Sequence, residues 1–311
     1  MDRLAELTPD KEVQSTKEKF DRVRQEGERE IPYGLTNDYM FRAVFQKNPT
    51  ALKGLIAAAL GRSPEEITSC EIQNPIVLGE SIDAKTCILD IQTCINGREK
   101  INVEMQMGNL GNWPKRALYY TCSMYTDLKA GSDYHHVLPC IHIGFVSRSP
   151  FPDNERFFSR YLLAEEGGHV FTEDFALVMI NLGRIPEGLT GEGDSQELWR
   201  WARLLCAKSW KEAVDMSEQS AGMREAVVTM HEMSQEETIR NQCLARILYQ
   251  GDMNSARQDG YQEGHQEGCK DGMRRVNRLN AHLIAAGRLE DLVRASEDLQ
   301  YQEALLEELG L

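Results

Sequence analysis

The sequence lacks the features that mark membrane, secreted and zinc-binding proteins. No apolar run reaches the roughly 20 residues that a membrane-spanning helix needs, and residues 1–30 are charged throughout, unlike a secretory signal peptide. The 8 cysteines form no CxxC pair and the 7 histidines no HxxxH pair, which are common zinc spacings. Several cysteines lie in apolar runs, as buried free thiols do. We therefore expect a protein of a reducing cytoplasm, with no membrane partner.

An excess of basic charge is also missing. The chain of 311 residues carries 35 basic and 49 acidic side chains, a formal net charge of −14, which disfavours a simple nucleic-acid coat. The imbalance is uneven, because residues 31–150 hold 11 side chains of each sign and residues 151–311 hold a net charge of −12. The least acidic part of the chain contains two prominent carboxylates, Asp90 and Glu104.

These carboxylates occupy two short alternating segments, residues 86–92 and 101–106, with an Asn96-Gly97 turn signal between them. Two strands joined by a turn would bring the acids close together. Paired carboxylates repel each other unless a cation lies between them, and oxygen ligands of this kind suit Mg²⁺ or Mn²⁺. The pattern predicts a metal-dependent active site. The alternative is an ordinary hairpin with a polar face and unrelated acids.

The length of the turn follows from matching the apolar faces of the two strands. A slip of one residue would turn a whole face over, so the apolar sets must match. A three-residue loop over residues 95–97, or an equivalent bulge, satisfies this condition and pairs Cys94 with Arg98. Its glycine would take the left-handed conformation that such loops need. Asp90 and Glu104 then share the polar face.

The order of the remaining elements predicts an α/β (α+β) fold with a mixed sheet flanked by helices. A solvated helix over residues 9–30 precedes a helix that Thr36 caps and that buries Met40, Phe41, Val44 and Phe45. Further helices are predicted over residues 50–60, 115–130 and 197–250, the second with Leu118, Tyr119, Cys122 and Tyr125 at helical spacing. Strands are predicted over residues 71–78, 84–94, 98–107 and 137–146, and one or two more over residues 170–182.

The C-terminal part repeats a glycine every four residues, at Gly260, Gly264, Gly268 and Gly272. On a helix this spacing lines one face with small residues and allows close approach of a second helix, which favours a homo-oligomer. A flexible linker is the alternative, since each glycine costs a helix about 1 kcal/mol relative to alanine. Short helices over residues 276–286 and 289–309 follow. Residues 280–311 hold two arginines and seven acids, which indicates an assembly module and not a groove-reading one.

The predicted domain organisation has four parts. An N-terminal helical extension (residues 1–30) precedes the core with the carboxylates (residues 31–190). A helical region (residues 191–255) and the glycine-rich assembly module (residues 256–311) complete the chain.

Several ordered motifs together resemble one family. They are Leu35-Thr36-Asn37-Asp38-Tyr39-Met40-Phe41-Arg42-Ala43-Val44-Phe45, Ile88-Leu89-Asp90-Ile91, Ile101-Asn102-Val103-Glu104-Met105-Gln106, and Arg116 with Tyr119-Tyr120. The sequence resembles the PD-(D/E)XK nuclease family transposases, the Rpn-like recombination-promoting group of bacterial proteins, over about residues 31–185. The glycine-repeat segment also resembles the C-terminal segment of that group.

The resemblance implies a restriction-endonuclease-like fold and hydrolysis of DNA phosphodiester bonds with Mg²⁺ (or Mn²⁺). Asp90 and Glu104 match the acids of the family motif and, with the Met105 backbone carbonyl, would bind the metal. Asp38 matches an acidic position sometimes near the metal. Leu89 replaces the motif proline.

Gln106 stands where the wider superfamily has lysine, a form that the Rpn-like group commonly shows. It would orient a water or a phosphate oxygen as a catalytic residue, while Lys115 and Arg116 are candidates for phosphate contacts. Two other functions stay open. One is a catalytically weak or inactive nuclease-fold protein that acts as a DNA- or protein-binding assembly module, and the other is an RNA nuclease. A DDE strand-transfer triad is not found.

Overall fold

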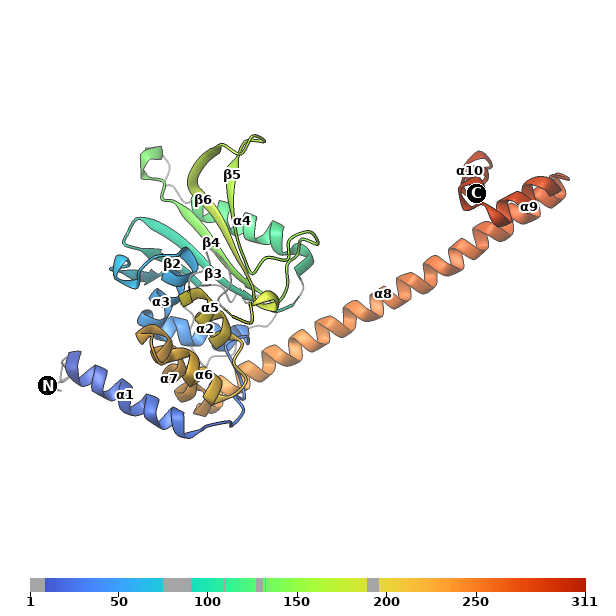
Figure 1. Cartoon of the computed structure of the whole chain (residues 1–311). Coiled ribbons are helices and arrows are strands. Elements are labelled where there is room, and N and C mark those ends of the chain that lie inside the picture. Colours follow the sequence, from blue (N-terminus) through green and yellow to red (C-terminus); the bar gives the residue numbers. More distant parts are fainter. Residues whose placement is uncertain (1–8, 75–90, 109, 127–130, 132, 189–195) are drawn as a thin grey trace. The chain divides into compact units, whose positions relative to one another are not determined.

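The computed structural model describes residues 9–74, 91–108, 110–126, 131, 133–188 and 196–311 (Figure 1). The chain divides into two compact units, Met1–Leu248 and Tyr249–Leu311. The sheet lies in the first unit, and the described part of the second is helical. No helix within these described ranges combines the length and the apolar character that crossing a membrane requires.

Six strands form one mixed sheet in the order β1-β2-β3-β4-β6-β5. The central strands β3, β4 and β6 are parallel and the outer pairs are antiparallel. Every residue of β4 is buried, as expected for a strand covered on both faces. The predicted mixed sheet with flanking helices is thereby confirmed. The strands are β1 (Cys70–Ile72), β2 (Ile91–Ile95), β3 (Glu99–Gln106), β4 (Cys140–Val146), β5 (Phe158–Ala164) and β6 (Val170–Asn181).

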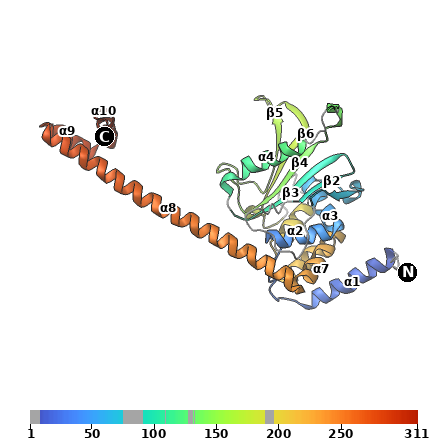
Figure 2. The ribbon, with the colours of Figure 1, turned by 180° about the vertical axis from the view of Figure 1, so that it is seen from behind.

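One face of the sheet packs on α2 (Asp38–Lys47) and α3 (Pro49–Leu60), and α4 (Trp113–Tyr125) covers the other face (Figures 1 and 2). The predicted buried stripe of α2 is confirmed, and the ring centroid of Phe41 lies 6.2 Å from that of Phe145 on β4. The predicted cap, Thr36, is wrong. Asn37 caps α2 because its side chain accepts hydrogen bonds from the backbone N–H groups of the first turn.

The first unit is completed by α1 (Pro9–Gln25), α5 (Gln196–Leu205), α6 (Trp210–Ser217), α7 (Ala221–Gln235) and the start of α8 (Glu237–Ala285). The prediction of a solvated first helix is wrong for part of α1, because Phe20 and Val23 are buried and α1 contacts α6 and α7. The predicted helical content after residue 197 is confirmed.

The second unit contains the rest of α8 together with α9 (Leu289–Glu297) and α10 (Leu299–Glu308). The four glycines of the repeat lie within α8, so the predicted helix is confirmed. Residues 251–275 are exposed, and a Cβ at any of the four glycines would meet nothing within 4 Å. A partner for this helix stays a prediction. Three helices share a small core, formed by Leu279, Leu283, Ala295, Leu305 and Leu306.

Candidate active site

Strand β3 presents its polar side chains on the sheet face that α4 covers. Side chains alternate along a strand, so Asn102, Glu104 and Gln106 lie on this face while Val103 and Met105 join the core under α2 and α3. The predicted separation of polar and apolar residues is confirmed in this strand. The position of the Glu104 carboxylate is therefore set by β3, which carries it, and by α4, which covers it.

The turn between β2 and β3 has the predicted odd length, but the loop lies one residue later than predicted, so Cys94 pairs with Lys100 and not with Arg98. Ile95 pairs with Glu99, which leaves a three-residue loop between them. Gly97 takes the predicted left-handed conformation (φ 61°), and so does Asn96 (φ 54°). The Asn96 side chain accounts for the shift, because its Oδ1 accepts a hydrogen bond from the Thr68 backbone N–H at 2.7 Å. An odd loop preserves the assignment of faces.

Asp90 lies outside the described residues, and the described β-ladder stops one residue short of it. Ile91 pairs with Val103, the residue before Glu104. In the sequence Asp90 directly precedes Ile91, and Val103, the partner of Ile91, directly precedes Glu104. The convergence of the two carboxylates on one cation stays a prediction.

Glu104 is a nearly buried carboxylate, 8% exposed, with three polar neighbours. Trp113 Nε1–H donates to Glu104 Oε2 at 3.0 Å, and Arg116 donates to Oε1 in an ion pair. His142 Nε2 lies 3.4 Å from Oε2. Burial alone raises the pKa of this carboxyl group, but His142, Arg116 and Trp113 together hold the pKa below its ordinary value. Glu104 is therefore ionised at neutral pH.

The contact between Trp113 and Glu104 depends on a glycine in the neighbouring strand. Gly144 of β4 pairs with Glu104, and a Cβ built on it would lie 2.2 Å from Trp113 Cζ2. The missing methyl group thus lets the indole lie directly on the sheet. Helix α4 begins at Trp113, two residues earlier than predicted, with Pro114 in its first turn. Proline is common there because its missing N–H needs no partner.

Arg116 links the two polar residues at the end of β3. Its Nη2 donates to both Glu104 Oε1 and Gln106 Oε1, and the Gln106 amide in turn donates to the Gly108 carbonyl. Arg116 Nε is buried and has no hydrogen-bond partner in the described part of the chain. Lys115, one residue earlier, is exposed. The structure thus brings together Glu104, Gln106 and Arg116, and it places Lys115 outside their contacts.

A buried histidine on the neighbouring strand lies beside Glu104. His142 is fully buried on β4, and its Nδ1 lies 3.0 Å from Asn102 Nδ2. If Nδ1 accepts from this amide, the ring proton is on Nε2, which faces Glu104 Oε2. Sequence reasoning missed both His142 and Trp113. A lone polar residue in the apolar segment 137–146 was the signal for the histidine, and Trp-Pro before a helix was the signal for the tryptophan.

Asp38 belongs to a different set of contacts. Its carboxylate accepts hydrogen bonds from Arg246 Nε at 3.1 Å and from Arg246 Nη2 at 2.5 Å. The two side chains are only 12% and 15% exposed, and Arg246 lies in the first turns of α8, within the first unit. The structure therefore gives Asp38 a stabilising partner, and its predicted place near a metal stays a prediction.

The described residues supply part of a divalent-cation site. No group of three or more His, Cys, Asp or Glu side chains suited to a metal occurs among the residues that the structure describes. Glu104 fits as one ligand, because each of its oxygens keeps a lone pair after the contacts above. Carboxylate and backbone carbonyl oxygens, such as that of Met105, are donors that Mg²⁺ accepts. Asp90 would have to complete the set.

The exposed face of α4 corrects a further prediction. The residues predicted at helical spacing do not form a buried stripe, since Leu118 is 47% and Tyr119 68% exposed. The contact of Trp113 with Gly144 sets the phase of the helix. It turns inward the residues Trp113, Ala117, Thr121 and Met124. Tyr119 is therefore exposed on the same helix as Arg116.

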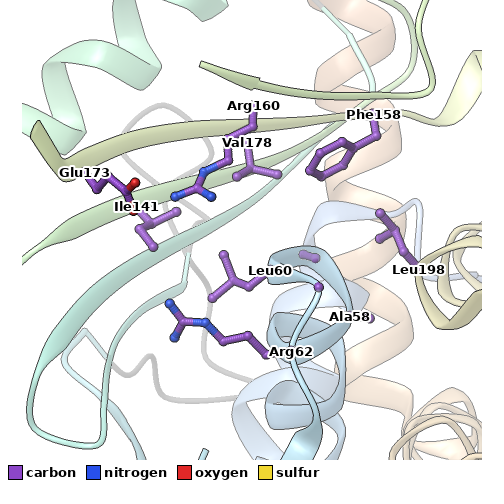
Figure 3. A pocket seen from close by; sticks show the side chains of 11 residues that line it. Ala58, Leu60, Arg62, Ile141, Phe158, Arg160, Glu173, Val178 and Leu198 are labelled. Atoms are coloured by element: carbon purple, nitrogen blue, oxygen red, sulfur yellow. The ribbon is translucent and has the colours of Figure 1, made fainter. Parts of the chain in front are cut away.

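A separate hollow of about 360 Å³ lies on the opposite sheet face, between the end of α3 and strands β4, β5 and β6 (Figure 3). Arg62 and Arg160 line it together with Glu173 around an apolar floor. Arg62 donates to both oxygens of Glu99 at 2.8 and 2.9 Å, so its charge is already balanced. The charges of this hollow cancel, and no carboxylates converge there, so the face with Glu104 is the stronger candidate.

Comparison with known proteins identifies the family. A family model described as "PD-(D/E)XK nuclease family transposase" matches residues 35–260, which covers β3, α4 and the Glu104 site. No curated protein gives a significant match, and no solved structure does. The sheet order, the carboxylate on its central strand and this match agree with the resemblance inferred from the motifs. The chain belongs to the PD-(D/E)XK nuclease family transposases.

Proposed function

We propose that this protein is a metal-dependent DNA endonuclease of the Rpn-like, recombination-promoting type, acting in the bacterial cytoplasm. The observation that carries the proposal is Glu104, an ionised and nearly buried carboxylate on a central strand whose neighbour, β2, begins one residue after Asp90 in the sequence. Burying a charge is costly unless it is used or paired. Family membership makes cleavage of phosphodiester bonds the leading use.

In this proposal Asp90 and Glu104, with the Met105 carbonyl, hold Mg²⁺ or Mn²⁺. A divalent cation at such a site lowers the pKa of bound water and stabilises negative charge on phosphate oxygens. The hydrogen bond from Trp113 holds the Glu104 carboxylate in place, so little of its freedom has to be lost when it binds a ligand. Asp38 is a less favoured ligand, because Arg246 already holds its carboxylate.

The remaining polar groups would bind the substrate. Gln106 orients a water or a phosphate oxygen through its amide, and the guanidinium of Arg116 matches the geometry of a phosphate. Lys115 is exposed next to them and adds a second positive charge. Gln106 offers hydrogen bonds and no charge, so positive charge at the phosphate has to come from a metal or from these two residues.

The test is nicking of supercoiled plasmid DNA by the purified full-length chain with Mg²⁺ or Mn²⁺. D90N and E104Q preserve side-chain shape and remove the charge, so we expect each to lower the rate by at least about 100-fold. E71Q is the matched control, because Glu71 is an exposed carboxylate on β1 of the same sheet. Equal cleavage by the wild type, D90N and E104Q would mean a contaminating nuclease and would end the proposal.

A second function is favoured by the contact between Arg116 and Glu104. A cation that fills the position beside the carboxylate is also what a nuclease fold without activity would contain. Such a protein would act as a DNA- or protein-binding assembly module, with the glycine-lined helix joining two copies. Metal-independent gel shifts without any cleavage would select this function. Cleavage of single-stranded RNA under the conditions of the plasmid assay would identify an RNA nuclease.

A further inference from the structure

The two oxygens of Glu104 face different surroundings. Oε2 points to the indole of Trp113 and to the buried His142, whereas Oε1 is bound by Arg116, whose side chain is 34% exposed. A ligand that arrives from solvent therefore meets Oε1 first. A divalent cation and the guanidinium of Arg116 then need the same oxygen.

Arg116 also occupies the other group that the proposed site would use. The same Nη2 atom donates to Gln106 Oε1, so one nitrogen of the guanidinium joins Glu104 to Gln106, and we name this arrangement the Arg116 bridge. Two positive charges do not share a site of this size, since like charges repel strongly where water is scarce. Binding of a divalent cation requires the Arg116 bridge to open.

The geometry of the Arg116 bridge makes opening feasible. A guanidinium binds a carboxylate best through two parallel hydrogen bonds, but Arg116 uses Nη2 alone and leaves Nε buried without a partner in the described residues. This pairing is incomplete, unlike that of Arg62 with Glu99, which uses both nitrogens and both oxygens. The Arg116 side chain is long and partly exposed, so it can leave by rotation without displacing α4.

We infer that Arg116 is a built-in counter-cation that a divalent metal displaces, and that the released guanidinium is then free to bind the phosphate of the substrate. The inference rests on the proposed function. Binding of the metal and binding of the anionic substrate then strengthen each other, because each favours the conformation in which Arg116 has left Glu104. The Arg116 bridge keeps the Glu104 carboxylate balanced when neither is bound.

The decisive measurement is binding of Mn²⁺ to the full-length chain without DNA, detected as the loss of the free Mn²⁺ signal in electron paramagnetic resonance. R116Q removes the competing charge and should bind Mn²⁺ at least about fivefold more tightly than the wild type, the lower end of usual coupling between sites. At the same time R116Q should cleave DNA more slowly, because the phosphate contact is lost. Tighter metal binding with weaker cleavage is not expected from a merely structural arginine.

K115Q is the matched control, since it removes the same charge one residue away without touching Glu104. Its Mn²⁺ affinity should stay within about twofold of the wild type, because exposed charges are screened. If R116Q binds Mn²⁺ as the wild type does, or more weakly, displacement of Arg116 is wrong. If E104Q binds Mn²⁺ as well as the wild type, the proposed metal site itself is wrong, which separates the two failures.

A measurement on the wild type covers the case of a poorly folded R116Q. The Arg116 Nε–H resonance, assigned by its absence in R116K, reports the Arg116 bridge directly. It should move in step with Mg²⁺ occupancy as the guanidinium leaves Glu104. A resonance that is unchanged at saturating Mg²⁺ would contradict the inference.

Discussion

At the scale of single residues, the position of the Glu104 carboxylate depends on an atom that is missing from Gly144. The indole of Trp113 occupies the space of a Cβ there, at 2.2 Å, and reaches Glu104 Oε2 from that place. Neither residue carries charge, and neither belongs to a nuclease motif. They nevertheless determine which lone pairs of Glu104 stay open to a ligand.

The substitution G144A tests this dependence. The added methyl group has to push a buried aromatic ring out of a packed position, so the free energy of unfolding should fall by about 1–3 kcal/mol. Urea unfolding followed by circular dichroism measures the change. G188A is the control, because a Cβ at Gly188 meets nothing within 4 Å. Equal midpoints for the two variants would show that the ring moves freely, and that the sheet does not fix it.

A second prediction at this scale concerns the thiol of Cys243 on α8. Burial, with a smaller contribution from Asp38, raises the pKa of this thiol to about 12. The folded state therefore keeps the proton that the unfolded chain releases near its ordinary pKa. The resulting stabilisation is complete below about pH 9 and is lost as the pH rises towards about 12.

The wild type should accordingly lose roughly 1 kcal/mol more stability than C243A between about pH 8 and pH 10, because the unfolded thiol releases its proton in this range while the folded thiol keeps it. Unfolding by urea at the two pH values measures the difference, and C243A corrects for every other group that titrates in this range. Parallel changes in the two proteins would mean that the folded thiol titrates normally.

Single residues also show what the sequence could and could not reveal. Alternation along residues 101–106 was enough to place Glu104 and Gln106 on one polar face. His142 could not be placed in the same way. It meets Asn102 across 40 residues, through a parallel pairing of β3 with β4 that nothing local in either segment specifies. Asp90, on which the metal site also depends, lies outside the described residues.

At the scale of elements, local sequence signals predicted where a helix ends and that the turn has an odd number of residues. They predicted less well which face of a helix is buried and how the strands pair. The sequence correctly predicted that a helix ends at residue 60, where Gly61 caps α3, and that Gly97 is left-handed. The loop of the hairpin lies one residue later than predicted, which shifts the strand pairing by two residues, because Asn96 bonds to Thr68 before β1, a contact across 28 residues. The strand β5 was missed, and its ladder with β6 contains register shifts after Leu162.

The glycine-lined part of α8 yields the prediction for this scale. The double variant G264A/G268A adds methyl groups where nothing lies within 4 Å, so it should stabilise the helix by about 1 kcal/mol per site. Thermal melting followed by circular dichroism at low protein concentration measures this gain. The opposite result, a loss of stability and of self-association in sedimentation experiments, would show that a second helix packs against this face.

At the scale of the whole molecule, the candidate site and its supports all lie in the first unit, which ends at Leu248. That boundary falls within α8, and the segment of α8 before it belongs to the core. Ile239 and Cys243 are buried there, and Arg246 balances the carboxylate of Asp38. The second unit contains its own small core, so the two units do not need each other for burial of their apolar side chains.

Two truncations test this division of the chain. Residues 1–248 should fold cooperatively and, if the proposed function is right, nick plasmid DNA at the rate of the full chain. Residues 1–236 lose only twelve residues more, yet they leave Asp38 buried without Arg246, which costs about 3–5 kcal/mol, and they expose the core under Ile239. We therefore expect the shorter fragment to unfold at far lower urea concentration.

If 1–248 proves as unstable as 1–236, the boundary is misplaced and α8 beyond Leu248 supports the nuclease fold. If both fragments match the full chain, the pairing of Asp38 with Arg246 contributes little, and Asp38 becomes available again as a ligand.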